Sequence, residues 1–342
     1  FPPQFFTHIY EKVINNPLKE PNYLYIHLLQ HIIKVGQFIR YEKNIILWIY
    51  RSLYFVHLRQ NSEIEDNAMS KNDAFKIDID GILKDKASKY YNKIPRFLIN
   101  YLKRTTHQDD INGILERNKG LEGVDFMRSL VDNEFNLTLQ IKGEDNIPDD
   151  GRFVFASNHP LGGLDGICLS AKLGKKYNGR IKYLVNDLLY YIDPLKPIFV
   201  PINKYGAQAK DSAKAINEAY ASENQIITFP AGLCSRKING EIKDLEWMKS
   251  FIVKSIEFQR DIIPIHFKAK NSNFFYNFAN IRKMLGLKFN IELIYLPDEM
   301  YKNSNQSFTI TFGKPISWKT FNKSKTPSQW AQYVKDIVYT MG

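Results

Sequence analysis

The chain has 342 residues, 44% of them hydrophobic, which is enough for one large core or two modest domains. Its 47 basic and 36 acidic side chains leave a net charge of +11, so we expect an anionic partner. Nucleic acid, an anionic membrane surface and an acidic carrier protein all fit this charge, although many soluble proteins are basic without such a partner. No stretch reaches about 18 uninterrupted apolar residues, which argues against a transmembrane helix. The two cysteines, Cys168 and Cys234, suggest no disulfide framework and fit a reducing cytosol.

Residues 1–68 differ in composition from the rest of the chain. They are rich in Ile, Asn, Lys, Tyr and Phe and contain a single glycine, Gly36. One interpretation is an appended or poorly specified helical extension, with the functional protein starting near Met69. The other is a genuine helical domain whose apolar helices lie between Tyr23 and Phe55. Contacts between residues 20–55 and the later core would distinguish the two.

Residues 69–135 are expected to form an amphipathic helical N-terminal region. The clearest apolar stripe follows the spacing i, i+3, i+4, i+7, i+8 and consists of Ile94, Phe97, Leu98, Tyr101 and Leu102. Basic side chains such as Arg96, Lys103 and Arg104 occupy the other face. Such a stripe fits two roles: packing of the helix on its own domain, or binding of the helix to a membrane surface.

After Asn136 short apolar segments alternate with helical patterns. We expect strands at 136–142, 153–157, 181–186, 198–202, 225–229, 262–268 and 308–312. Helices are expected at 165–175, 207–222, 246–259, 274–285 and 327–340. This alternation predicts an α/β fold, in which a mixed, largely parallel sheet is flanked by helices, with residues 136–342 forming one domain.

The stretch Phe153–Asp165, FVFASNHPLGGLD, joins a buried strand to a turn with polar side chains. A strand that ends near His159 would deliver the imidazole to the rim of the sheet, where Gly162 and Gly163 would allow close approach of the backbone and a substrate. Asp165 follows where a helix would begin. An imidazole beside a carboxylate is the arrangement of a general base and its orienting partner. The alternative is a helix-capping Asp165 beside a purely structural histidine.

This stretch resembles a motif of the glycerolipid acyltransferase superfamily, the lysophosphatidate-acyltransferase-like proteins. Asn158, His159 and Asp165 match the family's NHxxxxD block, and FPAGLCSRK at 229–237 resembles its FPEGTRSR block. The segments IFVPINK at 198–204 and IIPI at 262–265 complete four blocks in the family's order. The resemblance covers roughly residues 136–318 and makes 136–342 the expected catalytic domain.

The resemblance implies an O-acyltransferase that uses a thioester donor, either acyl carrier protein or acyl-CoA. Cys168 and Cys234 are not spaced for metal binding with any histidine, so no metal and no further cofactor are expected. The resemblance implies His159 as the general base and Asp165 as the residue that orients it. It also implies a peripheral location at the cytoplasmic face of the membrane. No nucleic-acid partner is expected, because the basic residues are dispersed along the sequence and not clustered with aromatic residues. No Gly-x-Ser-x-Gly elbow is present, so direct transfer without an acyl-enzyme is expected. The residues expected to bind substrate are Asn158, Lys204, Gly232, Ser235, Arg236 and Lys237.

The chain departs from the family pattern in both main blocks. Five residues separate His159 from Asp165, where four are usual, so the turn must be wider for the two side chains to meet. In the second block Ala231 replaces a glutamate, and Leu233 and Cys234 replace a threonine and an arginine. Loss of a carboxylate and a guanidinium changes which polar head group can be bound.

We therefore expect the acceptor to be a lyso-lipid other than ordinary lysophosphatidate. A lyso-aminolipid of the ornithine or glycine type has a hydroxyl to acylate and a carboxylate for Arg236 or Lys204. Among the superfamily, the bacterial aminolipid O-acyltransferases are thus the nearest group. Two alternatives remain: a 1-acylglycerol-3-phosphate acyltransferase of phospholipid synthesis, or a non-catalytic lipid-surface binding module.

Overall fold

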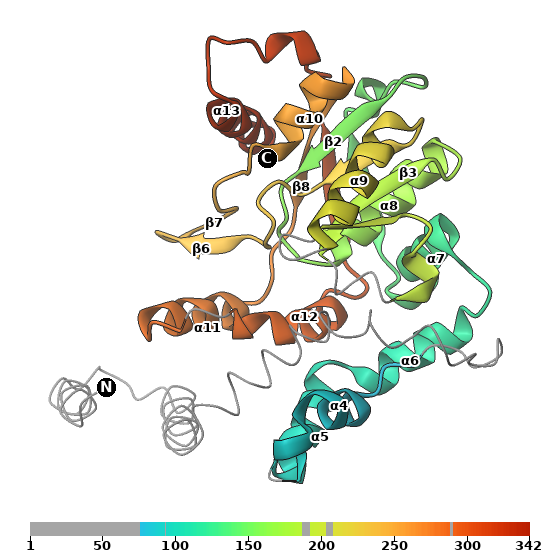
Figure 1. The fold of residues 1–342 in the computed structure, drawn as a ribbon, viewed down its shortest axis with the longest axis vertical. Coiled ribbons are helices and arrows are strands. Elements are labelled where there is room, and N and C mark those ends of the chain that lie inside the picture. Colours follow the sequence, from blue (N-terminus) through green and yellow to red (C-terminus); the bar gives the residue numbers. More distant parts are fainter. Residues whose placement is uncertain (1–75, 93, 187–191, 203–207, 288–289) are drawn as a thin grey trace, which may run out of the picture.

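The computed structural model describes residues 76–342, apart from residue 93 and the segments 187–191, 203–207 and 288–289 (Figure 1). Both interpretations of residues 1–68 therefore concern a part of the chain outside the described residues. Among the helices that are described, none combines the length and the apolar character needed to cross a membrane.

A seven-stranded sheet forms the centre of the molecule, in the order β1-β9-β8-β2-β5-β3-β4. Its strands are β1 (Thr138–Lys142), β2 (Phe153–Ser157), β3 (Ile181–Asn186), β4 (Phe199–Ile202), β5 (Gln225–Thr228), β8 (Asp261–Lys268) and β9 (Ser307–Phe312). Neighbouring strands are parallel except β8 and β9, which are antiparallel. The predicted α/β fold with a mixed, largely parallel sheet is confirmed.

Helices cover both faces of this sheet, so strand β2 is buried along its whole length. The flanking helices are α7 (Gly123–Ser129), α8 (Leu164–Lys176), α9 (Gln208–Ala221), α10 (Ser250–Phe258) and α13 (Pro327–Thr340). Side chains of β2 alternate between the two sides, because successive residues of a strand point to opposite faces. Phe155 joins the core beneath α7 and α8, whereas Val154 joins the core formed with α9, α10 and α13.

The described residues before the sheet, from residue 76 onward, are largely helical, as expected. Their elements are α4 (Ile79–Tyr91), α5 (Arg96–Thr105), α6 (Gln108–Arg117), α7 and a π-helical turn η1 (Leu130–Glu134). The expected apolar stripe of α5 was wrong at two positions, since Phe97 is 72% exposed and Tyr101 38% exposed. The buried side of α5 carries the expected Leu102 and also Ile99, which was not part of the expected stripe, because both residues form a small cluster with Leu83 of α4.

Two segments, one after β8 and one after β5, contain elements that the sequence did not predict. Between β8 and β9 the chain forms α11 (Asn273–Met284), a 3₁₀ turn η5 (Ile291–Tyr295) and α12 (Leu296–Lys302), of which only α11 was expected. A short antiparallel hairpin of β6 (Arg236–Ile238) and β7 (Glu241–Lys243) follows β5. Figure 1 shows α11 and α12 end to end below the sheet, with the hairpin on the same side.

Candidate active site

Strand β2 delivers His159 to the carboxyl edge of the sheet. It ends at Ser157 and pairs in parallel with β5 on one side and β8 on the other. The turn after β2 and the block after β5 therefore leave the sheet at the same edge, where α/β folds place their ligand sites. The backbone amide of Ser235 donates a hydrogen bond of 2.7 Å to the carbonyl of His159. The structure thus joins two blocks that lie far apart in the sequence.

The side chains of His159 and Asp165 meet despite the longer turn. Nδ1 of His159 lies 2.9 Å from Oδ2 of Asp165, and the Asp165 side chain is completely buried. An ionised carboxylate can only accept, so the proton on the imidazole is placed on Nδ1. No group in the described part of the chain bonds to Nε2, and 14% of the His159 side chain remains exposed. The ring also packs on Phe229 at the end of β5, with centroids 4.1 Å apart. The arrangement leaves Nε2 as the atom that can accept a proton.

The extra residue in the turn is accommodated by the same carboxylate. Oδ2 of Asp165 accepts the backbone amides of Leu161 at 3.0 Å and Gly162 at 3.4 Å, which draws the turn around it. Gly162 has a φ of 78°, a conformation that costs other residues about 1–2 kcal/mol. A Cβ at this position would also lie 3.0 Å from Leu296 and 3.1 Å from Cys234. The wider turn therefore depends on a glycine at 162, closely covered by the start of α12.

The two groups of the pair shift each other's pKa. Burial alone would lower the pKa of His159, because it penalises the imidazolium, but the charge and the hydrogen bond of Asp165 prevail and raise that pKa. Burial would likewise raise the pKa of Asp165, yet His159 and the amides of Leu161 and Gly166 lower it. The site thus holds an ionised carboxylate beside an imidazole of increased basicity, which is what a general base requires.

Neither cysteine is poised as a nucleophile. Burial raises the pKa of the Cys168 thiol far above its ordinary value. Burial also raises the pKa of Cys234 to about 11, even though Arg236 acts in the opposite direction. A thiol reacts as its thiolate, so both side chains are inert near neutral pH. This agrees with the expectation of direct transfer without an acyl-enzyme.

Ser235 is buried beside His159 and serves as a link between elements. Its hydroxyl donates to Oδ1 of Asp244 over 2.6 Å, and the same oxygen accepts the backbone amide of His159 at 3.2 Å. Both polar groups of Ser235 are therefore engaged within the protein, and its role in binding substrate stays a prediction. Sequence reasoning missed Asp244, which belongs to none of the four blocks and lies between those at 229–237 and 262–265; its only signal was its position shortly after Lys237.

Arg236 is also committed to internal partners. Its guanidinium lies 3.0 Å from Oε1 of Glu292 in η5 and donates 2.6 Å to the carbonyl of Cys234. Arg282 of α11 approaches the same carboxylate, with its Nε 2.7 Å from Oε2, and Glu292 is completely buried. Sequence reasoning did not anticipate Glu292. Through these contacts Arg236 connects the β6–β7 hairpin to the segment between β8 and β9. Its contact with substrate stays a prediction.

The remaining predicted substrate residues differ in their surroundings. Asn158 pairs with the backbone of Phe267 in β8, donating 3.0 Å to its carbonyl and accepting 2.7 Å from its amide. The side chain of Asn158 thus extends the β2–β8 pairing by one step and holds the turn in place. Gly232 is exposed with a φ of 67°, and Lys237 is partly exposed on β6. Lys204 lies outside the described residues.

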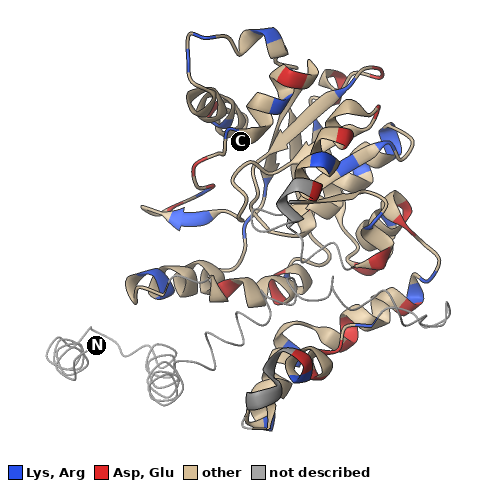
Figure 2. Cartoon of the chain, viewed as in Figure 1, with Lys and Arg blue, Asp and Glu red and all other residues tan. Residues whose placement is uncertain are grey.

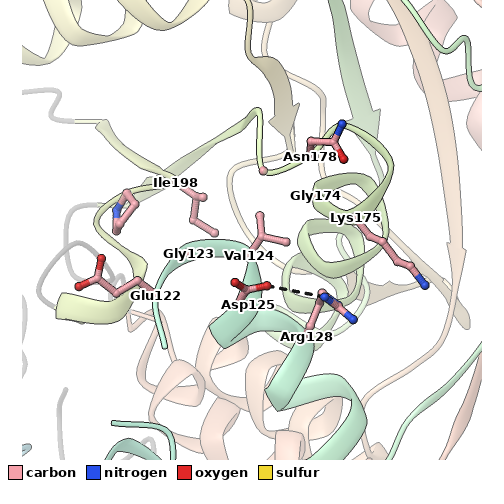
Figure 3. A pocket seen from close by; sticks show the side chains of 11 residues that line it. Glu122, Gly123, Val124, Asp125, Arg128, Gly174, Lys175, Asn178 and Ile198 are labelled. Carbon is pink, nitrogen blue, oxygen red and sulfur yellow. Dashed lines mark ion pairs between the residues drawn. The ribbon is translucent and has the colours of Figure 1, made fainter. Parts of the chain in front are cut away.

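A cavity of about 550 Å³ opens on another side of the molecule, between α7, the end of α8 and the loop before β4 (Figure 3). Asp125 and Arg128 form a 3.6 Å ion pair on its wall. Lys175, in the last turn of α8, lines the cavity, whereas Asp165 lies in the first turn. At a rise of about 1.5 Å per residue these ends of the helix are roughly 15 Å apart. This cavity is therefore not placed to present a substrate to His159.

The sequence matches a family model described as "Acyltransferase" over residues 81–341. The chain belongs to this acyltransferase family. Two curated relatives are both described as "Lyso-glycine lipid O-acyltransferase". The one from Bacteroides thetaiotaomicron is 54% identical over 274 residues, which are 80% of this chain and 100% of the relative. The one from Phocaeicola vulgatus is also 54% identical over 274 residues, 80% of this chain and 98% of the relative.

These relatives confirm the resemblance inferred from the four blocks, and the acyltransferase is an enzyme of lipid metabolism rather than a non-catalytic binding module. Among solved structures, the crystal structure of the 1-acyl-sn-glycerophosphate (LPA) acyltransferase PlsC from Thermotoga maritima aligns with this acyltransferase at a TM-score of 0.42 and 12% sequence identity. That alignment covers 77% of this chain and 92% of the PlsC chain.

Proposed function

We propose that this acyltransferase moves a fatty acyl group from a thioester donor to the hydroxyl of a lyso-aminolipid of the glycine type. The observation that carries the choice of acceptor is the 54% identity to two lyso-glycine lipid O-acyltransferases over essentially their whole length. The departures of the second block from the family pattern at Ala231, Leu233 and Cys234 agree with an acceptor other than ordinary lysophosphatidate.

The chemistry follows from the pair at the edge of the sheet. Nε2 of His159 takes the proton of the acceptor hydroxyl as its oxygen attacks the thioester carbonyl, and Asp165 stabilises the imidazolium that forms. The new C–O bond forms, the C–S bond breaks, and the departing thiolate takes the proton back from Nε2. Acyl carrier protein and coenzyme A both supply such a thiol, and the positive net charge of +11 favours either anionic donor.

The acceptor can be tested with the purified 342-residue chain. Lyso-glycine lipid and lysophosphatidate are supplied in parallel, each with acyl-carrier protein and with acyl-CoA, and the doubly acylated products are quantified by mass spectrometry. We expect the glycine-bearing acceptor to be acylated faster with at least one donor. Faster acylation of lysophosphatidate with both donors would contradict the proposal and favour phospholipid synthesis.

The same proposal includes peripheral binding to an anionic membrane, since the acceptor is a lipid. Phe97 and Tyr101 project from α5 at 72% and 38% exposure, next to basic residues of that helix. The Tyr101 hydroxyl lies 2.5 Å from that of Tyr295 in η5, which packs in turn on the exposed Phe274 of α11. Aromatic and basic side chains together are typical of helices that lie at the lipid interface. Elsewhere Lys and Arg are spread over many elements (Figure 2), which does not favour a nucleic-acid groove.

Substitution of Phe97 and Tyr101 by serine tests this membrane surface. We expect the double variant to bind vesicles containing anionic lipid at least about tenfold more weakly, because burial of one aromatic side chain contributes roughly 1.5–3 kcal/mol. Co-sedimentation with vesicles measures the change. The matched control is Tyr333→Ser, which removes a 40% exposed aromatic side chain from α13. Equal losses in both variants, or no loss in either, would exclude α5 as the docking surface.

A further inference from the structure

Asp244 is a buried carboxylate that the proposed chemistry does not use. It lies directly after β7, and only 1% of its surface is exposed. Burial of a carboxylate is costly unless hydrogen-bond donors surround it. Its donors include the backbone of His159 and the side chain of Ser235, both at the candidate site, which is the reason to assign it a role.

Both oxygens of this carboxylate accept hydrogen bonds. Oδ1 accepts the backbone amide of His159 at 3.2 Å and the Ser235 hydroxyl at 2.6 Å. Oδ2 accepts Nε1 of Trp247 at 2.9 Å, and the Trp247 side chain is buried in the core beneath α10 and α13. One side chain thus connects the turn after β2, the block after β5 and the core on one face of the sheet.

The backbone of Asp244 is fixed from the other side by α13. Its amide donates 2.6 Å to the Tyr339 hydroxyl, and its carbonyl accepts the Lys335 ammonium at 2.9 Å. Helix α13 itself contacts β8 and α10, so it belongs to the rigid body of the sheet. The carboxylate is therefore held on a rigid support, as a residue that orients a catalytic base must be.

We propose that Asp244 is a positioning residue for His159: it anchors the backbone of the histidine and places a second negative charge near its imidazole. The inference rests on the proposed role of His159 as the general base. The backbone bond fixes where the side chain of residue 159 begins, while Asp165 fixes the orientation of its ring. Misplacement of a base by about 1 Å is enough to cost roughly a hundredfold in rate.

The charged groups that face His159 come from three elements. Asp165 on α8 and Asp244 after β7 raise the pKa of the imidazole, with Asp165 the stronger of the two, while Arg236 on β6 lowers it and burial opposes the charged form. Lys335 of α13 bonds to the backbone of Asp244 from the other side, and Lys243 at the end of β7 and Glu246 after it are also near Lys335. Removing the charge of Asp244 should therefore lower the pKa of His159. Transfer requires the neutral imidazole, so the acid limb of the rate profile should move to lower pH.

Asp244→Asn tests this inference, because it keeps Oδ1 as an acceptor and removes the charge. We expect kcat to fall about tenfold to a hundredfold with little change in KM for the acceptor, because a neutral amide oxygen holds the backbone of His159 more weakly than a carboxylate does. We also expect the acid limb of kcat/KM to shift to lower pH. In this variant the side-chain NH₂ group would face Nε1–H of Trp247, and two hydrogen-bond donors cannot pair. The double variant Asp244→Asn, Trp247→Phe removes the second donor and avoids this conflict. The matched control is Asp261→Asn, which removes a carboxylate bound to the Trp318 amide at the opposite end of β8.

The titration of His159, followed by NMR in the wild-type and Asp244→Asn proteins, gives a readout that does not depend on activity. A lowered imidazole pKa in the variant but not in the Asp261→Asn control supports the inference. An unmoved pKa and an unmoved acid limb in a folded variant overturn it. If instead His159→Ala retains transfer while the imidazole pKa still falls in Asp244→Asn, the proposed mechanism fails and the effect of Asp244 on His159 stands.

Discussion

Replacement of His159 by alanine is expected to lower acyl transfer by about 10²–10⁴-fold, the usual contribution of a positioned general base. The loss should appear in kcat, because alanine removes the group that takes the hydroxyl proton while the surrounding backbone bonds to Ser235 and Asp244 can remain. Steady-state rates with lyso-glycine lipid and a thioester donor measure it. Circular dichroism and thermal melting show whether the variant is folded.

A matched control removes a histidine that lies outside the site. His107 bonds to Asp110 and Asp298 and has a φ of 51°, a conformation that asparagine tolerates. We expect His107→Asn to keep nearly full transfer. Appreciable residual transfer in a folded His159→Ala protein would exclude His159 as the base, and with it the direct mechanism proposed above.

The second large effect concerns stability rather than chemistry. Glu292→Gln should lower the free energy of unfolding by about 3–5 kcal/mol, because it leaves two largely buried guanidinium groups without their shared carboxylate. Arg236 and Arg282 retain only 9% and 12% of their side-chain exposure. Urea unfolding of the wild type and the variant measures the difference.

The control for this experiment is Glu241→Gln, which breaks the exposed pair with Lys243 on the neighbouring hairpin. We expect no measurable change in its unfolding midpoint, since exposed pairs contribute little. Unchanged stability of Glu292→Gln would mean that Arg236 does not depend on Glu292. The guanidinium would then be free to bind the carboxylate of the acceptor, as the sequence predicted.

The sheet was predictable because its strands are short apolar runs between turn residues. Strands β2 and β3 were placed with the correct ends, and the ends of the others differ by no more than two residues. The sequence could not reveal the strand order, or that β8 and β9 are antiparallel, because pairing depends on contacts between distant segments. Phe97 of α5 was wrongly expected to be buried, because helical periodicity predicts an apolar stripe but not which of its residues pack against another element.

The sequence predicted the residues of the candidate site only where they belong to a recognisable motif. The pairing of His159 with Asp165 was expected from their spacing and from the resemblance, and the structure places the two side chains in contact. Asp244 and Glu292 belong to no block, and they meet His159 and Arg236 only after the chain has folded back by 85 and 56 residues. No local pattern marks a carboxylate that completes a contact over such distances.

The two hydrogen bonds between the Asn158 side chain and the backbone of Phe267 have a consequence for folding during synthesis. These residues are 109 positions apart, and ribosomes add about 5–20 residues per second. Roughly 5–20 s therefore pass between synthesis of the turn and emergence of the strand that holds it. Before β8 emerges, β2 can pair with β5, but its other edge has no partner strand. We expect the nascent polypeptide to expose that apolar edge for this time, as an edge to which other strands could bind.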